Sequence, residues 1–177
     1  KQWALEILKK EFDEGAVFDA EPAVYRDEGL TVIEDLLHFL RYVAMHEPKL
    51  TAEGSIYRRN QQQIIELMAV SEELVDKGGW RFGYGRHFRD YPDRFSLLYD
   101  FCYYRGYLQE NPGNKLLITI QAEEAFQLPG DVLALEMYKF WVRLYKRPIP
   151  GLAMLTRMIC TAASEAWVEE GALLGLL

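Results

Sequence analysis

The chain has 177 residues, of which 50% are apolar and 14% aromatic, a composition that supports one buried core and excludes a disordered protein. Its formal charge of −7 excludes a general polyanion binder, because such proteins are basic overall. Residues 1–56 carry 6 basic and 12 acidic side chains, whereas residues 57–147 carry 13 basic and 12 acidic, so any nucleic-acid contact must be local.

The first part of the chain predicts two helices separated by an acidic loop. Apolar residues recur at helical spacing over residues 2–14, and residues 16–30 contain a proline and a glycine, which favour a loop. Thr31 followed by Glu34 forms a capping box. A strong helix is therefore expected after this loop, with an apolar face made of Ile33, Leu36, Leu37, Leu40 and Val43.

A strand and a second helix are expected next. Residues 49–51 predict a short strand, and Gly54 predicts a turn after it. The apolar spacing then predicts a helix that begins at Arg58 or Arg59 and runs to Val75.

The following segment predicts a third helix and a hairpin. Asp93 is expected to cap a helix over residues 93–105, which Gly106 ends. Residues 107–110 and 115–120 are β-rich runs around an Asn-Pro-Gly-Asn turn, which favours a β-hairpin.

This element order predicts a mainly α fold, a winged helix-turn-helix made of three helices plus a β-hairpin wing, with flanking N- and C-terminal helices. We expect the winged-helix domain over residues 31–128, after an N-terminal helix and linker over residues 1–30. Residues 129–177 are expected to form a C-terminal helical annex of two antiparallel helices in which Trp141 is largely buried. The predicted core residues are Leu36, Leu40, Ile64, Met68, Leu98 and Phe101.

The stretch LLHFLRYVAMHEPKLTAEGSIYRRNQQQIIELM joins a leucine-rich helix to a Leu-Thr-x-x-Gly turn and a basic pair that leads the next helix. The later stretch FSLLYDFCYYRGYLQE…LLITIQAEEAF adds an apolar helix that ends in Gly and two short strands. Over roughly residues 33–128 these features resemble the helicase-associated domain beside bacterial XPB-type helicases. The resemblance implies a winged-helix module that contacts DNA or docks onto a helicase, and it carries over Thr51, Gly54, Arg58 and Arg59 from the turn motif.

Few residues offer chemistry. There is no GxxxxGK[ST] phosphate loop, and His38, His46 and His87 are scattered, with no pair of His or Cys at metal-ligand spacing. We therefore expect no enzyme activity, no catalytic residue, no metal site, no cofactor and no small-molecule substrate. Cys102 and Cys160 each lie in an apolar helical pattern, which predicts two buried thiols in the reducing cytoplasm. No apolar run is long enough to span a bilayer, so no membrane partner is expected.

Residues 78–94, GGWRFGYGRHFRDYPDR, interleave aromatic rings with arginines. Three interpretations remain open: a platform for single-stranded bases, a protein-binding hot spot, or rings buried against the core. In the last case Arg86 and Arg89 should stay at the surface. The rings expected to be buried are Trp80 and at least one of Phe82 and Phe88.

Two functions from different classes are therefore predicted. The first is a helicase-accessory or nucleic-acid-binding winged helix, and the second is a protein-interaction or assembly module without DNA binding. Arg58 and Arg59 at a helix start either grip a phosphate or, for Arg59, pair with a nearby glutamate. The third helix does not suit base readout, since the side chains expected on its outer face are Ser96, Asp100, Tyr103 and Tyr104. The candidate nucleic-acid-binding residues are Arg58, Arg59, Arg81, Tyr84, Arg86 and Arg89.

Overall fold

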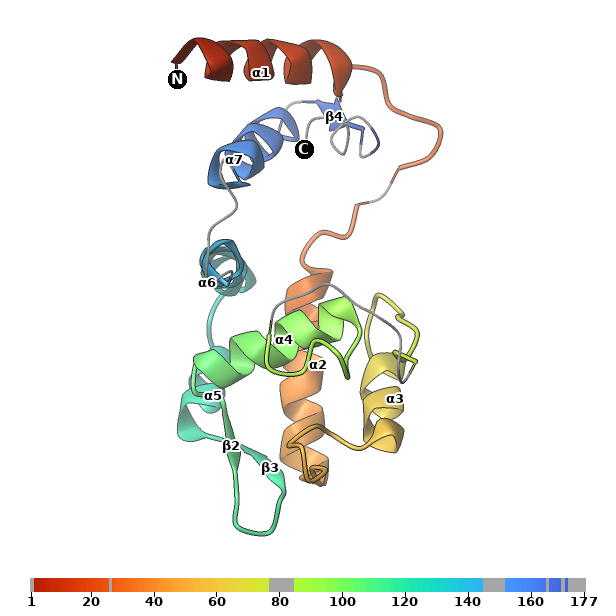
Figure 1. Cartoon of the computed structure of the whole chain (residues 1–177), viewed down its shortest axis with the longest axis vertical. Coiled ribbons are helices and arrows are strands. Elements are labelled where there is room, and N and C mark those ends of the chain that lie inside the picture. The colour runs from red at the N-terminus through yellow and green to blue at the C-terminus, as the bar shows by residue number, and fades with distance from the viewer. Residues whose placement is uncertain are drawn as a thin grey trace. The chain divides into compact units, whose positions relative to one another are not determined.

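The computed structural model of the chain describes residues 2–25, 27–76, 85–144, 152–164, 166–169 and 171. Within these ranges the protein is mainly helical with two small antiparallel sheets, which confirms the expectation of a mainly α chain (Figure 1). The chain divides into two compact units. We call Glu28–Lys146 the core unit, and Lys1–Asp27 together with Arg147–Leu177 the terminal unit.

In its described residues, the core unit has three helices, then a hairpin, then two helices. Its elements are α2 (Thr31–His46), α3 (Arg58–Glu66), α4 (Asp93–Tyr104), β2 (Leu108–Glu110), β3 (Leu116–Ile118), α5 (Ile120–Ala125) and α6 (Gly130–Arg143). β2 and β3 pair antiparallel, with Leu108 opposite Ile118 and Glu110 opposite Leu116, so the predicted hairpin is confirmed. Helix α5 begins where a strand was expected to end, at Ile120.

The segment between α2 and α3 runs beside this hairpin. Lys49 pairs with Lys115, and Leu50 pairs with Ile56, each through a single antiparallel bridge. Gly54 has a φ of 83°, a left-handed turn conformation that glycine adopts without strain. The predicted short strand is therefore present only as single bridge residues, one of which, Lys49, pairs with the hairpin.

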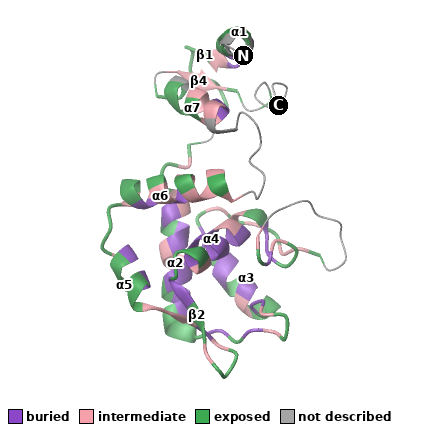
Figure 2. Ribbon diagram, turned by 60° about the vertical axis from the view of Figure 1, so that its left-hand side comes forward, coloured by how far each residue is buried: buried purple, intermediate pink, exposed green. Residues whose placement is uncertain are grey.

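The core lies between the first three helices of this unit. Figure 2 shows the buried residues of α2, α3 and α4 gathered at its centre. The six core residues predicted from sequence are all buried, namely Leu36, Leu40, Ile64, Met68, Leu98 and Phe101. Full burial of such a side chain stabilises the fold by roughly 1.5–3 kcal/mol, so each of these residues contributes to the stability of the unit.

Helix α4 is capped by a residue from outside the helix. The Glu72 carboxylate accepts hydrogen bonds from the backbone N–H groups of Arg94 and Phe95, both at 2.9 Å. The prediction that Asp93 caps α4 was wrong, because Pro92 holds the cap position and makes no side-chain cap bond. A carboxylate at a helix N-terminus satisfies orphan donors and complements the helix dipole.

A buried ion pair joins α2 to α4. Arg94 Nε donates to Asp35 Oδ2 at 2.7 Å, and Asp35 is fully buried. Two further Arg94 nitrogens bind Glu28 Oε2 and the Thr31 hydroxyl. The predicted capping box was therefore wrong, because Thr31 accepts from Arg94 and helix α2 has no side-chain cap bond.

Asp35 also explains why α3 is shorter than predicted. The helix was expected to reach Val75, but it ends at Glu66. Asp35 Oδ1 accepts the Ala69 N–H at 2.6 Å, which directs the backbone toward α2 and away from a helical turn. A side-chain acceptor on a neighbouring helix thus competes with the intrahelical hydrogen bond.

Helix α6 belongs to the core unit. Its Leu133 and Met137 are buried in the same cluster as α2 and α4, and this compact unit extends to Lys146 instead of residue 128. Trp141 is half-buried, so the prediction that it is largely buried is met in part. Leu133 and Met137 form the buried face of α6, and Trp141 is less buried than either of them.

The terminal unit contains α1 (Gln2–Gly15), β1 (Val17–Phe18), α7 (Leu152–Ala162) and β4 (Trp167–Val168). β1 and β4 pair antiparallel, and Glu169 N–H donates to the Ala16 carbonyl at 2.9 Å, which ties the two ends of the chain together. Phe12 and Ala16 are buried. Cys160 on α7 is exposed, so the prediction of two buried thiols holds only for Cys102.

Candidate interaction surfaces

Two predicted arginines lie at the start of α3. Arg58 and Arg59 are both exposed there. Arg58 Nη1 donates to the Val75 carbonyl at 2.8 Å, so it ties down the segment after α3. Arg59 extends into solvent, where its guanidinium is accessible to a phosphate or to a carboxylate of a partner.

Arg86 and Arg89 lie on the segment that precedes α4, and both are exposed, as predicted. The Arg86 guanidinium stacks 3.9 Å from the centre of the Tyr103 ring, and Arg89 lies 5.6 Å from that of Phe88. The other candidates from this stretch, Arg81 and Tyr84, lie outside the described residues, as do the predicted anchors Trp80 and Phe82.

Residues 85–91 lie against the outer face of α4, and we call them the covering segment. Gly85 has a φ of 134°, and a side chain there would collide with the Asp100 carboxylate. Next to it, the Arg86 N–H donates to Asp100 Oδ1 at 3.1 Å. Glycine is therefore required where the segment approaches α4 most closely.

Aromatic contacts hold the other end of the covering segment. His87 and Tyr91 lie with ring centres 5.3 Å and 5.1 Å from that of Tyr99 on α4. The Tyr91 hydroxyl accepts the N–H of the fully buried Ile56 at 2.7 Å, which links the covering segment to the chain before α3. Arg86 stacking on Tyr103 extends the same contact toward the end of α4.

Most of α4 is buried, in part by this packing and in part by the core. Ser96 and Asp100, which were expected on the outer face, are 6% and 1% exposed, so this prediction was wrong for both. Tyr103 is half-buried, and Tyr104 remains 61% exposed. Sequence periodicity could not reveal the cover, because the covering residues precede α4 in a stretch without helical spacing.

The covered interface contains polar atoms without a hydrogen-bond partner among the described residues, namely His87 Nε2, Tyr99 Oη and Asp100 Oδ2. Burial raises the pKa of Asp100, against the lowering effects of the Arg86 N–H and of the His87 and Arg86 charges. Burial also raises the pKa of the Cys102 thiol and keeps it neutral. These groups are enclosed by the fold and do not face solvent.

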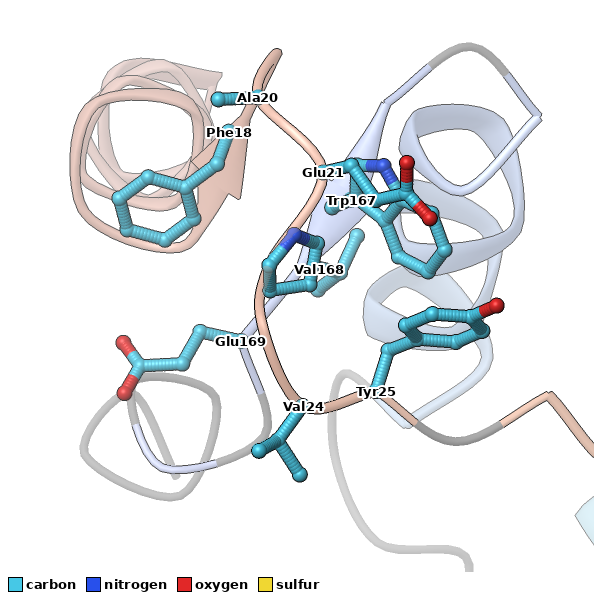
Figure 3. A pocket seen from close by; sticks show the side chains of 9 residues that line it. Phe18, Ala20, Glu21, Val24, Tyr25, Trp167, Val168 and Glu169 are labelled. Carbon is cyan, nitrogen blue, oxygen red and sulfur yellow. The ribbon is translucent and has the colours of Figure 1, made fainter.

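The terminal unit carries an apolar pocket of about 660 Å³, shown in Figure 3. We call it the Trp167 groove. Its apolar lining includes Phe18, Pro22, Tyr25, Trp167 and Val168.

The side chains of Glu21 and Glu169 also line this groove. Sequence analysis missed it, because its residues come from segments more than a hundred positions apart. The pairing of β1 with β4 brings these segments together.

The described residues also bear on metal binding and on membrane insertion. No group of three or more His, Cys, Asp or Glu side chains within them is arranged to hold a metal ion. None of the described helices combines the length and apolar character needed to cross a membrane. No family model matches the chain, and no curated protein or solved structure matches it significantly.

Proposed function

We propose that the core unit is a non-catalytic winged-helix module of the helicase-accessory type, which docks onto a partner protein. The order α2, α3, α4 and then the hairpin β2–β3 supports the winged-helix assignment. The bridge from Lys49 to Lys115 adds support, because it sets an extended segment beside the hairpin. In a winged helix the third helix normally enters the DNA major groove, so the state of α4 decides between DNA and protein partners.

The observation that carries the proposal is the burial of the outer face of α4. A recognition helix presents polar side chains to base edges, yet Ser96 and Asp100 are buried, and Asp100 lies beneath the covering segment. Asp100 would in addition repel phosphates if it were ionised and exposed. Side chains that remain accessible near the end of α4, above all Tyr104, suit a protein contact, since exposed tyrosines are enriched at protein interfaces.

The resemblance to the helicase-associated domain suggests that the partner is a helicase. A motor of this kind would supply the catalysis, and the present chain would contribute a docking surface. This division of labour agrees with the enclosed position of His87, Asp100 and Cys102, none of which faces solvent.

A second candidate function is sequence-independent binding of nucleic acid through phosphates. The exposure of Arg58, Arg59, Arg86 and Arg89 favours it, because phosphate contacts need accessible guanidiniums and no base readout. Arg58 and Arg86 already bind the Val75 carbonyl and the Tyr103 ring, which leaves Arg59 and Arg89 as the more accessible pair.

Titration of labelled duplex and single-stranded DNA with the full chain separates the two functions. We expect affinity weaker than about 10 μM at physiological salt for both DNAs. Tighter binding whose log K falls steeply with log salt, and which Arg59→Ala with Arg89→Ala weakens, would overturn the protein-docking proposal in favour of phosphate binding. The pair Lys139→Ala with Arg143→Ala, two exposed cations on α6, is the matched control.

A further inference from the structure

We infer that the Trp167 groove binds a short, extended, proline-containing peptide with a basic side chain, supplied by a partner protein. This inference rests on the proposed protein-docking function and specifies the chemistry of the partner. The groove lies in the terminal unit, whereas α4 and its cover lie in the core unit.

The shape of the groove fits proline rings. The rings of Tyr25 and Trp167 have centres 4.7 Å apart and planes inclined by 54°, so they form a wedge and not a flat stack. Figure 3 shows both rings on the same side of Val168. Peptides in the polyproline II conformation dock into grooves lined by aromatic rings and carry no internal hydrogen bonds that docking would disrupt.

An added β-strand fits the groove less well. β1 and β4 contain two residues each, and their Val17–Val168 and Phe18–Trp167 pairs already use the ladder between them. A strand that joins a sheet edge derives its affinity from a row of main-chain hydrogen bonds. Strands of this length offer too few of them, so side-chain contacts must supply the affinity.

The charges of the groove select a basic peptide. Glu21 and Glu169 are exposed, and their carboxylates stand on opposite sides of Val168 (Figure 3). The sequence of the terminal unit carries 6 basic and 10 acidic side chains, which adds a negative field around the groove. A lysine or arginine beside the prolines would complement these carboxylates and set the orientation of the peptide.

The exposed rings at the groove also call for a partner. Phe18 is 47% exposed and Tyr25 is 55% exposed, and both line the same pocket. Exposed aromatic side chains that line a pocket mark an interaction site more often than single exposed apolar residues do.

The test is a binding titration of the full chain with a labelled oligoproline peptide that has an arginine at each end. We expect saturable binding, which a peptide with glutamates at its ends shows about tenfold more weakly. Tyr25→Ala should abolish binding. The pair Glu21→Lys with Glu169→Lys, at two positions whose side chains are exposed, should weaken it about tenfold.

A matched control is the pair Glu123→Lys with Glu124→Lys, two exposed acids on α5 that change the net charge equally. This pair should leave peptide affinity unchanged. Equal weakening by both pairs, equal binding of the two peptides, or no saturable binding would each overturn the inference. Dimerisation of the chain that Tyr25→Ala abolishes would also overturn the inference, because a second copy of the chain would then occupy the groove.

The two proposals fail separately. If the chain binds neither the peptide nor DNA tightly, the inference about the groove is wrong and the proposed function still stands. Salt-dependent DNA binding together with peptide binding overturns only the proposed function of the core unit.

Discussion

Removing the Tyr91 hydroxyl tests how the covering segment is held. Tyr91 is fully buried, and its hydroxyl accepts the N–H of Ile56, which is also fully buried. Tyr91→Phe keeps the ring and its contacts with Tyr99 but leaves this amide without its partner. An unsatisfied buried donor costs about 1–3 kcal/mol. With a urea m-value near 2 kcal/mol/M, a loss of about 2 kcal/mol lowers the midpoint by about 1 M.

The assay is urea unfolding followed by circular dichroism, and the chain offers two matched Tyr→Phe controls. Tyr104 is 61% exposed, so Tyr104→Phe should change the free energy of unfolding by less than about 0.5 kcal/mol. The Tyr99 hydroxyl is buried and has no partner among the described residues, so Tyr99→Phe should cost nothing or stabilise. A midpoint that is unchanged in Tyr91→Phe, or lowered equally in all three variants, would refute the reasoning.

Three other predictions concern charged side chains in the core unit. Burial raises the pKa of Asp100, so its stabilising contribution is complete below the ordinary pKa of 3.8 and is lost as pH rises through the folded-state pKa. Wild type should therefore gain stability relative to Asp100→Asn as pH falls from neutrality toward about 4. Each tenfold difference in proton affinity between the folded and unfolded states corresponds to about 1.4 kcal/mol of stability. Parallel pH profiles of the two proteins in urea unfolding would contradict this prediction. Arg94→Leu leaves the Asp35 carboxylate buried and unpaired and should cost about 3–5 kcal/mol in urea unfolding, whereas Arg59→Leu at an exposed position should cost almost nothing. Glu72→Ala removes the cap of α4 and should cost about 0.5–2 kcal/mol in thermal unfolding, and an unchanged melting temperature would show that water replaces the cap.

Sequence periodicity was sufficient for two helices, α2 and α4, and for the six predicted core residues. Apolar residues at helical spacing predicted α2 and α4, and the Asn-Pro-Gly-Asn turn predicted the hairpin, because these signals are local. The end of α3 and the cap of α4 were not predictable in this way. Both depend on carboxylates, Asp35 and Glu72, that lie more than twenty residues from the amides they bind.

The interaction surfaces depend on contacts even more distant in sequence. The exposure of Arg86 and Arg89 followed from their charge, but the burial of Asp100 did not, since an aspartate in mid-helix is normally solvated. Its burial becomes intelligible once Gly85 and the Arg86 N–H are seen against it. The Trp167 groove likewise requires residues from both ends of the chain to meet.

The accessibility of position 96 to a thiol reagent tests most directly whether α4 is covered. Ser96→Cys, made together with Cys160→Ser to remove the exposed native thiol, places a reporter at a buried position of α4, and the native Cys102 is fully buried. We predict that this thiol reacts under native conditions far more slowly than the exposed reporter Tyr104→Cys in the same Cys160→Ser background, and that both react alike in urea. Equal native rates at the two positions would contradict the account, because α4 would then be open to a groove of DNA.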